Sequence, residues 1–145
     1  MPDRKYPLPI PVADEASEPF FRGAKERKLM LLRCARCGAY RLPGRDRCLD
    51  CWSTETEWTQ ASGRGKLHSF GVMHQQYHPA FASVIPYNFA VVELEEGPRL
   101  ITNIVGCAND DLRVGMPVEA VYDDVSDETT LVRFRPRTQT HKTPA

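Results

Sequence analysis

Residues 34–38 read CARCG and residues 48–51 read CLDC, so four of the five cysteines form two C-x-x-C motifs at short separation. Each motif makes a tight turn that points two thiolates at one ion, and two such turns complete a tetrahedron with Zn–S distances of about 2.3 Å. Gly38 stands where such a turn often needs a positive φ. The pattern predicts a structural zinc ribbon with one ion, bound by Cys34, Cys37, Cys48 and Cys51.

Other readings of the cysteines are weaker. Two disulfides need an oxidising compartment, and a redox C-x-x-C usually stands alone at the start of a helix. A rubredoxin-like iron site stays open, because its ligand set is the same. Four thiolates leave no open coordination position, so we expect the ion to hold the fold without catalysing hydrolysis. We expect the fifth cysteine, Cys107, to be a small buried hydrophobe.

The composition is that of a globular protein. The 145 residues include 19 Lys and Arg against 19 Asp and Glu, and 41% are hydrophobic. The N-terminal stretch MPDRKYPLPIPVADE has no apolar core after its charges, and no stretch reaches the roughly 20 apolar residues of a membrane helix. We therefore expect a cytoplasmic protein without a secretory signal or a membrane segment.

The residues before the first cysteine predict an extended arm and one helix. Four prolines between residues 2 and 11 give the arm polyproline character. Ser17 is expected to cap a helix that begins at Glu18 and ends near Lys28. A short strand over residues 29–33 then leads into the ribbon. We assign residues 1–33 to the arm and helix and residues 34–56 to the ribbon.

Short strands separated by turns follow from Trp58 onward. Gly71 is a candidate bulge, and Gly97-Pro98 is a candidate hairpin turn. Five strands in about 80 residues favour an OB-fold barrel, so the fold class is mainly β: helix, zinc ribbon and five-stranded barrel. The barrel is assigned to residues 57–136 and a polar tail to residues 137–145. The expected strands are 66–74, 87–95, 99–105, 117–122 and 130–135.

The charge is unevenly distributed along the chain. Residues 57–135 hold six Lys and Arg against eleven Asp and Glu, whereas residues 1–56 hold eleven against eight. An OB-fold that binds single-stranded nucleic acid needs a positive groove with stacking aromatic side chains. An acidic barrel argues against nucleic acid as a partner.

The sequence offers no recognisable catalytic residue. It contains no G-x-S-x-G motif, phosphate loop or dinucleotide fingerprint. The histidines His68, His74 and His78 are the plausible proton carriers of the barrel. His74 and His78 have the spacing of a metal pair on a helix, but Pro79 and the residues between them favour a strand end and a loop.

Two features remain as candidate contacts for a ligand. Arg64 lies between two glycines, which let a ligand approach the backbone, and its guanidinium can grip a phosphate. A plain linker turn explains the same residues. The loop His78–Phe81 offers an apolar tip as a contact surface, unless Phe81 folds back on the barrel.

Nearly the whole chain, about residues 7 to 136, resembles the family called domain of unknown function 35. The ribbon alone is unspecific, but its combination with the segments that follow is specific. These segments are PFFRGAKERKL (19–29), SGRGKLHSF (62–70), HPAF (78–81), PYNFAVVELEEGPRLITNIVG (86–106), DLRVGMPVEAVYDD (111–124) and VRFRP (132–136).

The resemblance implies a rubredoxin-like zinc ribbon joined to an OB-fold and associated with acyl-CoA. Such proteins are companion subunits of thiolase-like proteins, and the complexes make or break carbon–carbon bonds in acyl-CoA substrates. The catalytic residues then lie on the partner. Candidates for touching the CoA ester are Arg64, His78 and Phe81. The alternatives are a free-standing acyl-CoA-binding module and, less favoured, a nucleic-acid-binding ribbon–OB protein.

Overall fold

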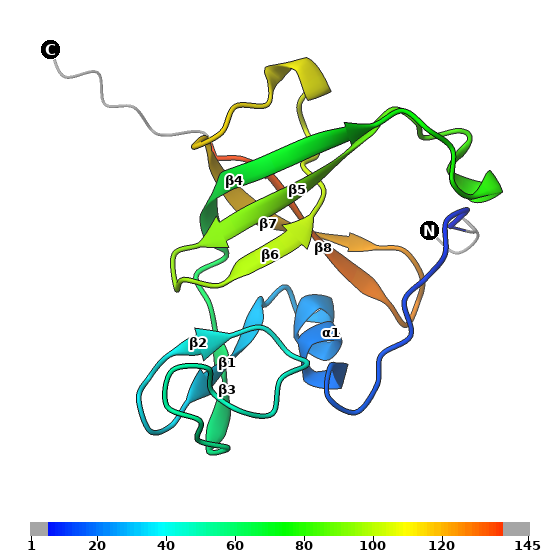
Figure 1. The fold of residues 1–145 in the computed structure, drawn as a ribbon. Helices are drawn as coiled ribbons and strands as arrows, with labels where there is room; N and C mark the ends of the chain where they lie inside the picture. The colour runs from blue at the N-terminus through cyan, green and yellow to red at the C-terminus, as the bar shows by residue number, and fades with distance from the viewer. Residues whose placement is uncertain (1–5, 138–145) are drawn as a thin grey trace, which may run out of the picture.

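Two antiparallel sheets of unequal size and one helix form the part of the chain that the computed structural model describes, residues 6–137 (Figure 1). The smaller sheet has the strand order β2-β1-β3, and the larger has the order β6-β5-β4-β7-β8. The helix α1 packs against β1 of the smaller sheet and against β7 and β8 of the larger one. The fold is therefore mainly β, as the sequence predicts.

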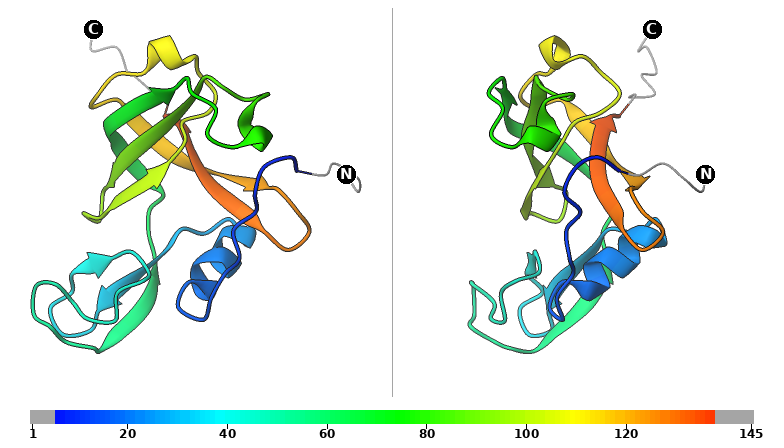
Figure 2. Two further views of the ribbon diagram at one scale, coloured as in Figure 1. Left: turned by 45° about the vertical axis from the view of Figure 1, so that its right-hand side comes forward. Right: turned by 90° about the vertical axis from the view of Figure 1, so that its right-hand side faces the viewer.

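The N-terminal segment runs along the molecule before the helix begins. Residues 6–13 contain no helix or strand and pass beside β8 (Figure 2), where the Tyr6 hydroxyl accepts a hydrogen bond from Nη2 of Arg133 at 3.0 Å. The helix α1 spans Glu18–Lys25. Ser17 precedes it as predicted, but the Ser17 hydroxyl bonds to the carboxylate of Asp14 and caps no helix N–H. The expected capping bond is therefore wrong, because the Ser17 oxygen accepts a hydrogen bond from the N–H of Asp14 at 3.1 Å instead of one from the helix.

The helix ends three residues earlier than expected, in a Schellman motif. The N–H of Lys28 bonds to the carbonyl of Gly23 at 2.9 Å, and the N–H of Arg27 bonds to that of Ala24 at 3.0 Å. This motif needs a left-handed residue at Arg27, whose φ is 63°. The Arg27 guanidinium contacts both carboxylate oxygens of Asp124 in β7, at 2.8 and 2.6 Å, and this pair ties the helix end to the barrel.

The smaller sheet contains a strand that the sequence pattern did not predict. Its strands are β1 (Met30–Cys34), β2 (Tyr40–Arg41) and β3 (Thr56–Gln60). All five residues of β3 pair with β1, from Cys34 opposite Thr56 to Met30 opposite Gln60. The sequence of β3, TEWTQ, is too polar to show a buried face, so its pairing depends on β1.

The larger sheet confirms the five predicted strands and curls into an OB-like barrel. Its closure runs through Phe134, whose N–H bonds to the carbonyl of Asn103 at 3.1 Å and whose carbonyl accepts from Val105 at 2.8 Å. Gly97-Pro98 forms the predicted hairpin between two neighbouring strands. The strands are β4 (Arg64–Met73), β5 (Tyr87–Leu94), β6 (Arg99–Thr102), β7 (Pro117–Asp124) and β8 (Thr130–Pro136).

The predicted bulge at Gly71 is wrong. Gly71 pairs in register with Phe89 of β5, and the irregularity of β4 lies between Leu67 and Ser69 instead. A side chain at Gly71 would collide with the ring of Phe89, which lies over this position. The glycine therefore makes room for an aromatic ring on the neighbouring strand, a cross-strand effect that the local sequence does not reveal.

One continuous hydrophobic core joins the two sheets. Leu29 and Leu31, at the start of the smaller sheet, are at most 1% exposed and belong to the same cluster as the barrel residues Leu67, Val118 and Phe134. The ribbon is therefore packed onto the barrel through buried side chains rather than attached by a flexible linker.

We expect Phe134→Ala to lower the free energy of unfolding by about 3–5 kcal/mol, because the ring is fully buried and its removal leaves a cavity. Urea unfolding followed by circular dichroism measures the loss. The neighbouring Arg135→Ala is the control: its exposed ion pair with Glu119 is worth less than about 1 kcal/mol. Equal stability losses in the two variants would contradict the assignment of Phe134 to the core.

Candidate functional site

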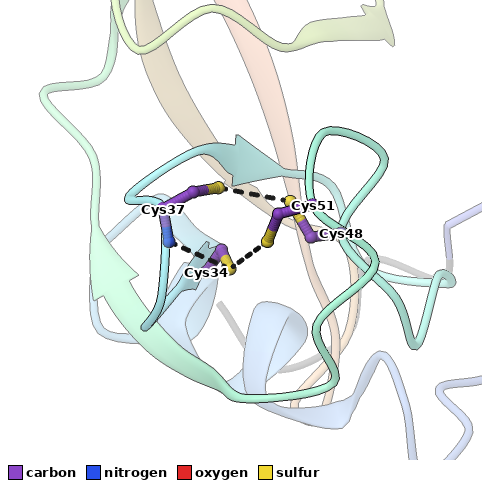
Figure 3. A group of neighbouring side chains, drawn as sticks. All are labelled: Cys34, Cys37, Cys48 and Cys51. Carbon is purple, nitrogen blue, oxygen red and sulfur yellow. Dashed lines mark hydrogen bonds between the residues drawn. The ribbon is translucent and has the colours of Figure 1, made fainter.

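The four ribbon cysteines converge on one point (Figure 3). The sulfur atoms of Cys34 and Cys51 are 3.5 Å apart, as are those of Cys37 and Cys48, and all four lie within 4.8 Å of one another. A tetrahedral site with Zn–S distances of about 2.3 Å places its sulfurs about 3.8 Å apart. The four cysteines are therefore positioned to bind a metal ion, as predicted.

Two turns with the same backbone hydrogen bond hold these sulfurs in place. In the first, the N–H of Gly38 bonds to the carbonyl of Cys34 at 2.9 Å. In the second, the N–H of Trp52 bonds to the carbonyl of Cys48, also at 2.9 Å. Both closing residues have a positive φ, 81° for Gly38 and 65° for Trp52. The geometry that Gly38 predicted is thus repeated at a residue that is not glycine.

Backbone N–H groups lower the pKa of two of the cysteine thiols. The N–H of Cys37 points at the sulfur of Cys34 and lowers the pKa of that thiol to about 6. The N–H of Cys51 acts in the same way on Cys48 and lowers its pKa. Both sulfurs are buried at the centre of the site, with Cys34 1% and Cys48 2% exposed.

The pKa values of the other two thiols are raised. At Cys37 the N–H of Ala39 favours the thiolate, but the neighbouring sulfur of Cys48, together with burial, raises the pKa to about 12. At Cys51 the N–H of Ser53 also favours the thiolate, but burial and Cys34 raise the pKa. The metal ligand is the thiolate, so metal binding at any protonated cysteine releases that proton.

The alternative of two disulfides does not match the geometry. All five cysteines are free, and sulfur separations of 3.5 Å are far from the bonded distance of about 2.0 Å. Cys107 lies outside the cluster and packs against the barrel core, but it is only partly buried rather than buried as expected. Burial raises the pKa of its thiol.

Arg64 begins β4 and is held by an acidic neighbour. Its Nε lies 3.1 Å from Oε1 of Glu95, in an ion pair whose side chains are both about half exposed. This contact lowers the pKa of Glu95. The Nη groups of Arg64 make no hydrogen bond within residues 6–137.

His78 and Phe81 lie in the loop that joins β4 to β5. The short helix η1 (Pro79–Phe81) starts after His78, whose Nδ1 accepts a hydrogen bond from the N–H of Ala80 at 3.0 Å. The ring of Phe81 lies 5.4 Å from that of Tyr87 and 6.2 Å from that of His78. Phe81 therefore folds back toward the start of β5, which is one of the two possibilities the sequence left open.

The structure does not bring Arg64 together with His78 and Phe81. The ten residues of β4 separate them, and a strand of this length spans roughly 30 Å. His68 is half exposed near Glu93, and His74 is exposed at the end of β4. Among the residues that the structure describes, the four cysteines form the one group of three or more potential metal ligands.

Sequence reasoning missed an exposed apolar turn beside the metal site. Leu49 is 63% and Trp52 69% exposed, and both belong to the second cysteine turn. The sequence could have indicated this turn, because Trp52 follows the second C-x-x-C motif at the position that Gly38 has after the first. None of the helices in residues 6–137 has the length and apolarity needed to cross a membrane.

Comparison with protein families divides the chain into two consecutive parts. Residues 21–57 match the family described as "ChsH2, rubredoxin-like zinc ribbon domain". Residues 58–123 match the family described as "ChsH2, C-terminal OB-fold domain". These descriptions agree with the four-cysteine site and with the barrel described above.

Three curated proteins are similar in sequence. The "Probable enoyl-CoA hydratase alpha subunit" of Thermomonospora curvata is 41% identical over 88% of this chain, which spans only 40% of that protein's length. A "DUF35 domain-containing scaffold protein" of Methanocaldococcus jannaschii is 37% identical over 74% of this chain and 77% of its own length. The "Benzoylsuccinyl-CoA thiolase subunit BbsA" of Geobacter metallireducens is 30% identical over 70% of this chain and 61% of its own.

A solved structure extends this similarity to three dimensions. A chain of the "Ltp2-ChsH2(DUF35) aldolase" superposes with a TM-score of 0.77 at 41% identity. The match covers 88% of this chain and 98% of that one. Both the ribbon and the barrel therefore have counterparts in a solved structure.

We expect Cys34→Ser to lose the bound metal and Cys107→Ser to retain it, because Cys34 is a buried member of the sulfur cluster and Cys107 is not. Elemental analysis of the purified variants measures the metal content per chain. Structural zinc contributes about 10–16 kcal/mol of apparent binding energy, so the metal-free variant should also lose at least the ribbon's structure. Full metal occupancy in Cys34→Ser would contradict the assignment.

Proposed function

The chain belongs to the DUF35 family, which joins a rubredoxin-like zinc ribbon to an OB-fold, and from this premise we propose that it is an accessory subunit of an acyl-CoA enzyme. Its partner is a thiolase-like protein, and the complex makes or breaks a carbon–carbon bond in the CoA ester. The observation that carries the proposal is the match over 98% of a chain of the Ltp2-ChsH2(DUF35) aldolase.

Zinc is the proposed occupant of the four-cysteine site. Cys34, Cys37, Cys48 and Cys51 would hold it with four protein ligands, so it would supply structure and leave no position for a substrate. Free thiols 3.5 Å apart also fit a reducing compartment, and we place the protein in the cytoplasm on this ground.

The histidines of the barrel support a noncatalytic role for this subunit. Nδ1 of His78 accepts a hydrogen bond from the N–H of Ala80 and so caps the start of the short helix η1. His68 lies 3.8 Å from Glu93, on a surface where the same carboxylate also pairs with Lys66 and Arg99. These contacts give both side chains structural partners, and we assign the acid–base residues of the reaction to the thiolase-like subunit.

We expect the chain alone to turn over no acyl-CoA and to form an active complex with its thiolase-like partner. Co-expression followed by size-exclusion chromatography tests the assembly, and a coupled assay for released CoA or acyl product tests activity. His68→Ala and His78→Ala should change kcat less than tenfold in the complex. Robust turnover by the isolated chain, or no association with the partner, would contradict the proposal.

We also propose that the barrel contacts the CoA ester, through Arg64 or through the loop with His78 and Phe81. Arg64 is half exposed, and its contact with Glu95 uses only Nε. Its two Nη groups are therefore available to bind a phosphate. The loop contributes aromatic rings, which suit an adenine or the pantetheine arm. Because the two places lie at opposite ends of β4, they are tested separately.

In the active complex, Arg64→Ala should raise the KM for the CoA ester roughly tenfold with little change in kcat, because one charge-assisted hydrogen bond is worth about 1.5–3 kcal/mol. Phe81→Ala tests the loop in the same assay. Arg99→Ala is the matched control, since Arg99 is also half exposed and paired with a glutamate of the barrel. An unchanged KM in both test variants would assign CoA binding to the partner alone.

A further inference from the structure

We propose that Arg41, in strand β2, is the buried counter-charge of the four-cysteine metal site and that its positive charge strengthens metal binding there. The inference rests on the proposed occupancy of that site by zinc and deepens it, because it names the residue that offsets the charge of the occupied site. It does not depend on the proposed role as an accessory subunit.

Arg41 is the one charged residue that is buried in the part of the chain that the structure describes, with 7% of its surface exposed. Its Nε donates a hydrogen bond to the carbonyl of Arg45 at 3.0 Å, but its Nη1 is buried without a hydrogen-bond partner. Within residues 6–137 it forms no ion pair with a carboxylate. Charged side chains are rarely buried this deeply without an opposite charge, because removing a charge from water is costly.

The strand register places Arg41 on the same face of the smaller sheet as Cys34. Arg41 pairs directly with Leu32 of β1, and Cys34 follows Leu32 by two residues on that strand. Directly paired residues of antiparallel strands project to the same face of a sheet, and so do residues two apart on one strand. On the opposite face, Leu31 and Tyr40 pack into the hydrophobic core. Arg41 therefore belongs to the metal side of the sheet and not to the core side.

The hydrogen bond of Arg41 directs its guanidinium toward the second half of the cluster. Arg45, whose carbonyl accepts this bond, lies in the segment between β2 and the second C-x-x-C motif, three residues before Cys48. The guanidinium is thus held between the sheet face that carries Cys34 and the segment that leads to Cys48. Both cysteines are buried, with 1% and 2% of their surfaces exposed.

A bound metal supplies the negative charge that Arg41 lacks. Four thiolates around one divalent ion carry a net charge of −2, so the occupied site is an anion inside the ribbon. Opposite charges attract more strongly where water is excluded. An anion from solution does not reach Nη1, because that atom is buried. Water and salt screen the other arginines of the loops around the site, which are exposed: Arg36, Arg45 and Arg47.

The test compares the zinc affinity of Arg41→Gln and Arg41→Lys with that of the wild type, each as the full chain. Competition with a chromophoric chelator measures the dissociation constant and the rate of zinc release. Gln keeps an N–H donor for the Arg45 carbonyl but removes the charge, so its dissociation constant should rise roughly 10–100-fold, as is found when groups that support metal ligands are removed. Lys keeps the charge, so its dissociation constant should stay within about threefold of the wild-type value.

Arg36→Gln is the matched control, because Arg36 lies inside the first C-x-x-C motif but is exposed. Its removal should change the zinc dissociation constant less than about threefold, since exposed charges interact weakly. The difference between wild type and Arg41→Gln should persist at high salt, because buried charges are screened little.

Tighter binding by wild type and Arg41→Lys than by Arg41→Gln supports the inference. It is overturned if Gln and Lys lose affinity equally, if neither loses affinity, or if Arg36→Gln loses as much as Arg41→Gln. If circular dichroism shows that Arg41→Gln does not fold its ribbon, zinc binding by Arg41→Lys decides: binding supports the inference and no binding overturns it. A wild type without zinc refutes the proposed occupancy and this inference together, whereas a wild type that binds zinc but no partner refutes the accessory role alone.

Discussion

The five-residue strand β1 is the element on which both halves of the molecule depend. Leu31, near its start, is fully buried in the core that extends into the barrel, and Cys34, at its end, is a buried member of the sulfur cluster. A strand of this length is too short to bend between these two positions. The position of the cysteine cluster relative to the barrel is therefore set by the packing of Leu31, and a metal bound there would fix the loops that the hydrophobic core does not reach.

The parts of the fold that the sequence predicted are those with local signals. The four ligands follow from the spacing of Cys34, Cys37, Cys48 and Cys51, and five runs of apolar residues coincide with β4 to β8. The predictions fail where the local structure depends on residues that are distant in the sequence. Strand β3 has little apolar character and forms because β1 offers its edge, and Gly71 accommodates a ring from β5. The separation of Arg64 from Phe81 likewise follows from strand length and direction, which residue types alone do not reveal.

The two halves also differ in how they treat charge. Barrel carboxylates are largely engaged within the chain: Glu93 pairs with three cationic side chains, and Asp124 binds Arg27. Because Arg27, and then Thr130, stabilise the carboxylate, the pKa of Asp124 lies well below its usual range. The exposed arginines of the ribbon have no such partners within the described residues. Its exposed acidic residues, Asp46, Asp50, Glu55 and Glu57, have no ion-pair partners in this part of the chain either, so the exposed surface of the ribbon carries unpaired charges of both signs.

The length of the molecule constrains how the chain could lie on the proposed partner. The ribbon and the loop between β4 and β5 are at opposite ends of the molecule in the views of Figures 1 and 2. Contact by the ribbon alone would anchor one end of the chain and leave the barrel free of a partner. Contact by both ends would require the partner to extend along the whole length of β4, and permanent complexes commonly bury about 2,000 Å² or more. The rigid core around Leu29 and Leu31 makes the second arrangement feasible, because it carries the ribbon and the barrel as one body and so no hinge has to be ordered when the complex forms.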